Sequence, residues 1–125
     1  MPQPKREKES VQQECEPPKH AIESLPVRVA VTKEGRLIVE PASLPIKLGA
    51  RQEAEWKCAD GSLEVRFAPS QTPFLGTSLR SPQNAASRSG IPDPRKTKKG
   101  SYRYVVLVTT RDGIFVSQDQ AVVIA

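Results

Sequence analysis

The segment KGSYRYVVLV, residues 99–108, is the most strand-like part of the chain. Tyr102 and Tyr104 stand two residues apart, and four aliphatic residues follow them. Successive side chains of a strand point to opposite faces, so Tyr102, Tyr104 and Val106 share one face while Val105 and Leu107 make the second face apolar as well. The segment therefore predicts a central strand whose two sides are both at least partly covered.

The C-terminal third is predicted to complete a hairpin around this strand. The turn RDG at residues 111–113 separates it from IFVSQDQAVVIA at residues 114–125. A similar hairpin is predicted near the N-terminus, where valines alternate with other residues over 27–32, the turn KEG follows, and RLIVE returns at 36–40.

A third hairpin is predicted over residues 53–67, where Asp60-Gly61 forms a favoured type I′ turn between two alternating runs. The piece IKLGA at 46–50 follows two prolines and is predicted to be an edge strand or a loop crossing. Strands at this spacing, without a helix between them, predict an all-β fold in which two antiparallel sheets pack as a sandwich.

The chain is predicted to hold one folded domain. Residues 1–25 combine Pro, Glu, Lys and Gln with few large apolar side chains, which predicts a flexible, disordered tail. Residues 26–125 form the predicted sandwich domain. Within it, residues 69–101 are rich in Pro, Ser, Gly and basic residues, and a connection of this length is either a functional loop or partly disordered.

Four motifs together resemble a known architecture: a tryptophan strand (EAEWKC), a turn (FAPSQTPF), a tyrosine-rich strand (GSYRYVVLV) and a final apolar strand (AVVIA). In this order they resemble the small cupredoxin-like, or immunoglobulin-like, β-sandwich domains found in bacterial proteins of unassigned activity. The resemblance covers residues 26–125. It implies the architecture and carries no activity with it.

Copper binding does not follow from the cupredoxin-like resemblance. A blue-copper site takes two imidazoles and a thiolate, usually with a weak axial thioether. In the copper-carrying relatives, the cysteine, a histidine and a methionine come soon after the strand that the segment with Tyr104 resembles. Here no Cys or His follows Cys58, the only methionine is Met1, and the only histidine is His20. We therefore expect no copper and no other cofactor.

Catalysis is not expected either. His20 lies in the predicted tail, so no Ser-His-Asp or Cys-His arrangement is available in the fold. Cys58 alternates with Trp56 on the inward face of its strand, which predicts a buried, inert thiol and a core tryptophan. Three carboxylates beside basic residues are predicted to belong to a charged outer face rather than to an acid/base pair: Glu53, Glu55 and Glu64. The sequence predicts no catalytic residue and no enzyme activity.

The net charge of +5 is concentrated in one segment. Residues 69–101 hold six basic side chains against Asp93 alone, so six minus one gives +5 there. The six are the candidate binding residues Arg80, Arg88, Arg95, Lys96, Lys98 and Lys99. Residues 80–99 are thus candidates to meet the phosphates of nucleic acid or another anionic partner, although no aromatic residues are interleaved to stack on bases.

A protein-interaction or structural module with an unknown protein partner is the function that the sequence favours, and binding of an anionic partner is the alternative. No run of about 18 apolar residues occurs, so no membrane span is expected. No apolar segment follows the charged N-terminus, so a cytoplasmic location is expected. The two cysteines, Cys15 and Cys58, agree with reduced thiols rather than a disulfide framework.

Overall fold

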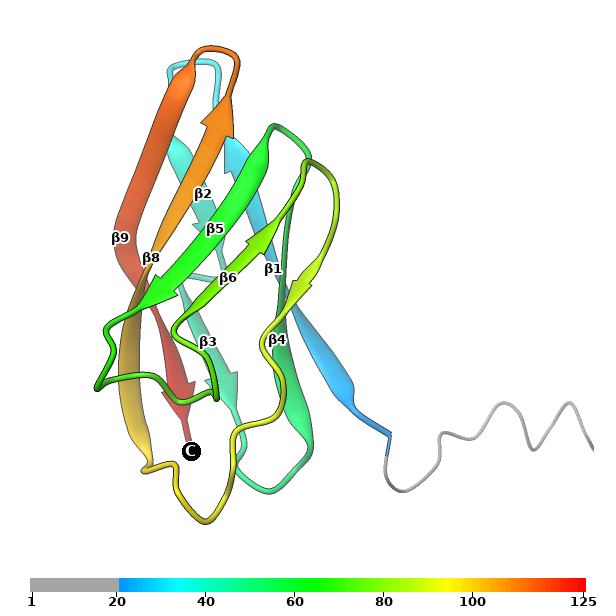
Figure 1. The fold of residues 1–125 in the computed structure, drawn as a ribbon, viewed down its shortest axis with the longest axis vertical. Helices are drawn as coiled ribbons and strands as arrows, with labels where there is room; N and C mark the ends of the chain where they lie inside the picture. Colours follow the sequence, from blue (N-terminus) through cyan, green and yellow to red (C-terminus); the bar gives the residue numbers. More distant parts are fainter. Residues whose placement is uncertain (1–20) are drawn as a thin grey trace, which may run out of the picture.

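The computed structural model describes residues 21–125, which form an all-β sandwich of two sheets (Figure 1). The described residues hold nine strands: β1 Glu23–Val31, β2 Leu37–Glu40, β3 Ser43–Ile46, β4 Gln52–Cys58, β5 Ser62–Phe67, β6 Ser78–Ser81, β7 Ser87–Arg88, β8 Gly100–Thr110 and β9 Gly113–Ile124. The four-stranded sheet has the order β2-β1-β4-β7 and the five-stranded sheet the order β3-β9-β8-β5-β6. None of these residues belongs to a helix that could cross a membrane. The predicted two-sheet sandwich is confirmed.

The C-terminal hairpin of β8 and β9 is confirmed, and β8 lies in the middle of the five-stranded sheet as predicted. A β-bulge interrupts the pairing, because Tyr104 lies opposite Gln120 whereas Val106 lies opposite Ser117. β9 therefore has one residue more than β8 at this point. The buried side chain of Gln120 compensates by donating from Nε2 to the backbone oxygen of Tyr104 at 2.9 Å.

The N-terminal hairpin of β1 and β2 is also confirmed. β1 starts at Glu23, inside the range 1–25 that was predicted to be a tail. The reason is a partner that local composition does not reveal: residues 23–25 pair in parallel with residues 52–54 of β4. Cys15 and His20, with the rest of the predicted tail, lie outside the described residues.

The predicted hairpin over residues 53–67 is wrong. β4 belongs to the four-stranded sheet and β5 to the five-stranded sheet, so the Asp60-Gly61 pair lies in a crossover between the sheets. Asp60 does not shape a tight turn there; its Oδ2 accepts a hydrogen bond from the Val31 amide at 2.8 Å. Both strands keep their apolar faces in the core, because a crossover buries these faces as well as a hairpin does.

The segment 69–101, predicted as one long irregular insertion, contains two short edge strands. β6 pairs antiparallel with β5, and β7 pairs antiparallel with β4, so the segment borders both sheets. Phe74 in this segment is buried, while Leu75 is fully exposed. These strands were missed because they are short and rich in serine, so they lack an apolar alternation.

Of residues 46–50, predicted to be an edge strand or a loop crossing, Ile46 ends the edge strand β3, which includes Pro45, and the rest lie in the connection that crosses from the five-stranded to the four-stranded sheet. β3 pairs in parallel with the last residues of β9, as β1 does with β4. The sheets are thus mostly antiparallel, with two parallel pairs between strands far apart in the sequence.

An aromatic cluster fills the centre of the core, where Trp56 of β4 meets two residues of the five-stranded sheet and one residue of the connection between β5 and β6. Its ring lies edge-on to those of Phe67, Phe74 and Tyr104, with centroids 6.4, 6.5 and 5.5 Å away. The indole Nε1 donates to the Tyr104 hydroxyl at 3.2 Å, and burial raises the pKa of that phenol to about 12. Trp56 and Cys58 are both buried, so their predicted inward orientation is confirmed.

Candidate functional site

Three connections meet at one end of the sandwich, the lower end in Figure 1. They are residues 47–51 between β3 and β4, residues 68–77 between β5 and β6, and residues 89–99 between β7 and β8. We call this region the loop end. Connections at the end of a rigid sandwich are common recognition surfaces, and this end carries the basic residues of the third connection.

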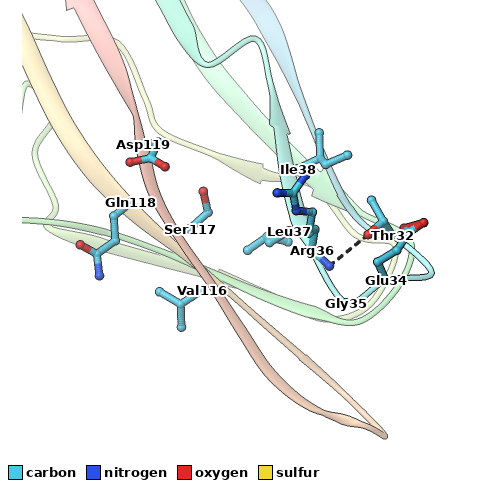
Figure 2. Close-up of a pocket in the computed structure, with 10 residues that line it drawn as sticks. All are labelled: Thr32, Glu34, Gly35, Arg36, Leu37, Ile38, Val116, Ser117, Gln118 and Asp119. Atoms are coloured by element: carbon cyan, nitrogen blue, oxygen red, sulfur yellow. Dashed lines mark hydrogen bonds between the residues drawn. The ribbon is translucent and has the colours of Figure 1, made fainter.

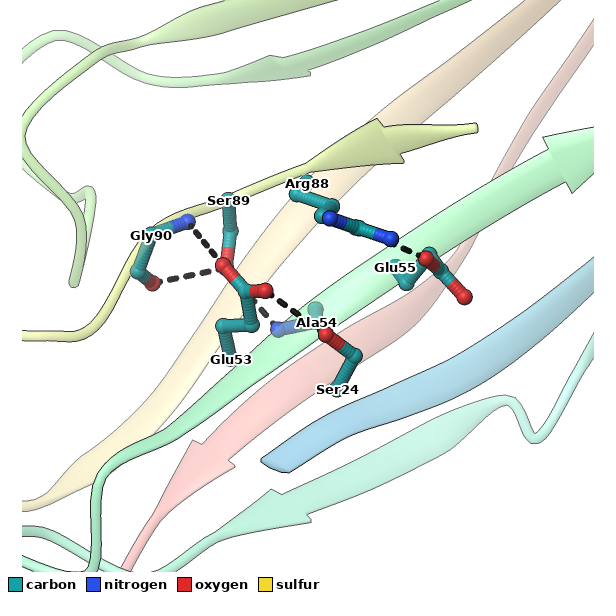
Figure 3. A network of polar contacts seen from close by, with 7 residues as sticks. All are labelled: Ser24, Glu53, Ala54, Glu55, Arg88, Ser89 and Gly90. Carbon is teal, nitrogen blue, oxygen red and sulfur yellow. Dashed lines mark hydrogen bonds and ion pairs between the residues drawn. The ribbon is translucent and has the colours of Figure 1, made fainter. Parts of the chain in front are cut away.

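A buried carboxylate anchors the start of the 89–99 connection (Figure 3). Glu53 is only 7% exposed, and its Oε1 accepts the Gly90 amide at 3.1 Å while its Oε2 accepts the Ser24 hydroxyl at 2.7 Å. Ser89 adds a second link, since its Oγ accepts the Ala54 amide at 2.9 Å. The carboxylate therefore joins β1, β4 and the segment that follows β7.

Sequence reasoning missed this role of Glu53 and placed it on a charged outer face. Glu55 fits that description, since it pairs with Arg88 at 2.9 Å, and so does Glu64, which pairs with Arg66. The one signal in the sequence is the small pair Ser89-Gly90, which allows a backbone to approach a strand closely. That signal gives no indication of which strand is approached.

The second half of the connection is held by its own turn and by a neighbouring connection. Asp93 accepts the Thr97 amide at its backbone oxygen, at 2.9 Å, and the Arg95 amide at its Oδ1, also at 2.9 Å. The Thr97 hydroxyl donates to the backbone oxygen of Pro73 at 3.2 Å, which ties residues 89–99 to residues 68–77. The basic side chains thus project from a backbone with defined hydrogen bonds.

The structure brings together four of the six predicted binding residues. Arg95, Lys96, Lys98 and Lys99 are all exposed at the loop end, and none of the four forms an ion pair within residues 21–125. We call these four residues the basic cluster. Their exposed charges are therefore available to an anionic partner.

The other two predicted residues, Arg80 and Arg88, lie on edge strands and face carboxylates. Arg80 lies opposite Glu64 in the β5–β6 register, 3.5 Å from it, and Arg88 lies opposite Glu55 in the β4–β7 register. The hydrogen bond to Glu55 raises the pKa of Arg88. These two arginines are partly neutralised and do not belong to the basic cluster.

A groove of about 620 Å³ lies beside the basic cluster, between the second and third connections. Its lining combines apolar and basic side chains, among them Phe74, Leu75, Ile91, Tyr102, Lys96 and Lys98. Leu75 is the most exposed large apolar side chain of the described residues. An apolar side chain beside unpaired cations suits a ligand that is itself apolar and anionic.

Within residues 21–125, no three His, Cys, Asp or Glu side chains lie close enough together to hold a metal ion. Cys58 is buried among core side chains, where its thiol is out of reach of a substrate.

Replacing Glu53 with alanine is expected to lower the free energy of unfolding by about 1–2 kcal/mol, because the Gly90 amide and the Ser24 hydroxyl lose their acceptor. Hydrogen exchange at the Gly90 amide should accelerate more than exchange in the core strands. The matched control is Glu55→Ala, which removes an exposed ion pair and should cost much less. Equal effects of the two substitutions on stability and on Gly90 exchange would contradict the anchoring role of Glu53.

No family model matches this chain, and no curated protein is significantly similar to it in sequence.

Proposed function

We propose that the protein is a non-catalytic binding module whose loop end receives an acidic segment of a partner protein. The observation that carries this proposal is the basic cluster, four unpaired cations beside a groove where Leu75 is fully exposed. Protein interfaces typically combine an apolar anchor with a charged rim, which sets specificity and association rate. The partner segment is therefore one that presents an apolar side chain flanked by carboxylates.

The strand pairing departs from the immunoglobulin-like form of the fold and leaves the cupredoxin-like form. Immunoglobulin sandwiches are built from antiparallel sheets with Greek-key connections, whereas β1 and β4 pair in parallel here. We do not extend this likeness to copper, since the sequence has one histidine and no methionine beyond Met1. The proposed module thus uses the scaffold alone.

Binding of nucleic acid by the basic cluster is the second candidate. Four cations within five residues favour it, since Lys and Arg clusters contact phosphates regardless of base sequence. Base stacking receives less support, because the groove offers one partly exposed aromatic ring, Tyr102, whereas its other aromatic residue, Phe74, is buried. An acidic protein segment therefore fits the surface better than a single strand does.

Neutralising the basic cluster to glutamine is expected to weaken binding of an acidic, apolar peptide by at least about tenfold. The probe is a peptide selected from a library that varies acidic and apolar positions, and its affinity is measured by fluorescence anisotropy at two salt concentrations. The control neutralises four exposed cations away from the loop end, Arg28, Lys33, Arg36 and Lys57, so that net charge falls equally. Both variants should keep the parent's thermal transition.

The substitution Leu75→Ser separates the two candidates. It should weaken binding of the peptide and leave binding of a random single-stranded oligonucleotide unchanged, because phosphate contacts do not use an apolar anchor. If the oligonucleotide binds more tightly than every selected peptide, and its affinity depends on the basic cluster but not on Leu75, the second candidate replaces the first. Equal losses in the cluster variant and its control would argue against any site at the loop end.

A further inference from the structure

β9 carries an unpaired edge away from the loop end. On the side opposite β8, β3 pairs only with residues 121–124, so residues 113–119 of β9 have no strand beside them within the described part of the chain. Figure 2 shows this place, where residues 116–119 line one wall of an open groove and residues 32–38 line the other. The second wall ends in β2, which belongs to the other sheet.

This edge lacks the features that keep other sheet edges from pairing. β3 contains Pro45, and β7 has only two residues. β6 has four residues, carries Arg80 and is followed by Pro82. β2 is equally short, and Pro41 follows it. Proline, charge and short length are the usual means of blunting an edge.

Residues 113–117 of β9 contain no proline and no charge, and they present apolar side chains to solvent. Ile114 is 64% exposed and Val116 is 50% exposed, on the same face of the strand. The bulge at residues 118 and 119 ends the regular part of this edge. A regular, apolar and unprotected edge is a template for pairing with another strand.

We propose that residues 113–117 pair antiparallel with the same residues of a second copy of this chain, which joins the two five-stranded sheets across a two-fold axis. With the axis at Phe115, Ile114 of each copy lies opposite Val116 of the other, so the two exposed side chains become cross-strand neighbours. A shift of one residue would place Ile114 and Val116 opposite side chains of the other face of the strand. The alternation of exposed apolar residues therefore sets this register.

Charge complementarity favours a second copy over an unrelated peptide. In this register Arg111, in the β8–β9 turn, and Asp119 of the second copy lie at the same end of the paired residues 113–117, and the reverse pair lies at the other end. The edge is thus complementary to itself in both its apolar and its charged residues. Isologous interfaces require this property, because each contact occurs twice.

Sedimentation equilibrium of the full chain tests the proposal. The parent should show a reversible dimer, and Val116→Lys should raise the dissociation constant at least tenfold, because it places a lysine at the pairing centre of each copy. The matched control is Ile22→Lys, which introduces the same charge at an exposed isoleucine outside β9 and outside the loop-end groove and should leave dimerisation unchanged. A parent that stays monomeric at all accessible concentrations overturns the proposal, as does a dimer insensitive to Val116→Lys.

A charge exchange tests the register and remains informative if Val116→Lys fails to fold. Arg111→Asp and Asp119→Arg should each weaken the dimer by placing like charges at the same end of the paired residues, and the double variant should restore it. A double variant as weak as the single ones overturns the proposed register. These measurements do not involve the basic cluster, so their outcome is independent of the peptide experiment.

Discussion

Replacing Trp56 with alanine is expected to lower the free energy of unfolding by about 3–5 kcal/mol. The indole is fully buried, it packs against three aromatic rings, and it leaves a cavity that the β-sheet backbones on either side cannot close. The substitution also removes the hydrogen bond to the Tyr104 hydroxyl, which then stays buried without its donor. A loss of this size is a large share of the stability of a small domain.

Urea denaturation followed by circular dichroism measures this effect, since the variant has no tryptophan left to report by fluorescence. Trp56→Phe is the control, because it keeps part of the ring contact and loses only the indole nitrogen and the remaining volume. The free energy of unfolding of this variant should lie between the values for the parent and for the alanine variant. An alanine variant with the parent's denaturation midpoint would show that the cluster does not hold the two sheets together.

Replacing Gly61 with alanine is expected to cost about 3 kcal/mol, near the upper end for overpacking. An added Cβ would lie 2.3 Å from the backbone oxygen of Thr109 and 2.9 Å from its carbonyl carbon. Both atoms belong to β8, the central strand, so they cannot move aside as a side chain would. The crossover between β4 and β5 would have to shift away from the sheet.

Gly76→Ala is the matched control for this prediction, because the nearest atom to its added Cβ is 3.9 Å away. Thermal unfolding of both variants checks the comparison, with a clear fall in the midpoint for Gly61→Ala and little change for Gly76→Ala. Similar midpoints for the two variants would mean that the crossover is looser than its contact with Thr109 implies.

The contrast between two predicted hairpins shows how far a sequence can specify this fold. Alternation and a short turn correctly predicted the hairpin of β8 and β9. These two strands follow one another in the sequence, and no other strand lies between them in the sheet. The same signals over residues 53–67 indicated a hairpin that does not exist. A pattern of apolar residues specifies which face of a strand is buried, and both a hairpin and a crossover satisfy it. The choice depends on β1 and β7, whose pairing with β4 is not visible in local sequence.

The candidate site was predictable only where charge is contiguous in sequence. The basic cluster lies within five residues, so composition alone located it. Arg80 and Arg88 were grouped with it, but each lies opposite a carboxylate in a register that joins distant segments. Glu53 was missed for the same reason, since its burial depends on Gly90, 37 residues away. Long-range pairing, which no local pattern encodes, decides which of these charges are free.

The single tryptophan lies between the two sheets, so its fluorescence reports whether the sheets are packed against each other. Trp56 stands on one sheet and donates its hydrogen bond to a tyrosine on the other, so its excited state senses the interval between the two layers. Emission from so apolar a site should be blue-shifted, and excitation of the neighbouring Tyr104 should transfer to it efficiently while the layers are in contact. Separation of the sheets would move the emission to the red and abolish the transfer together. If the sheets part before water enters the core, the energy transfer would fall before the emission shifts to the red. The two fluorescence signals of an unlabelled sample can therefore distinguish sliding of the sheets from complete unfolding.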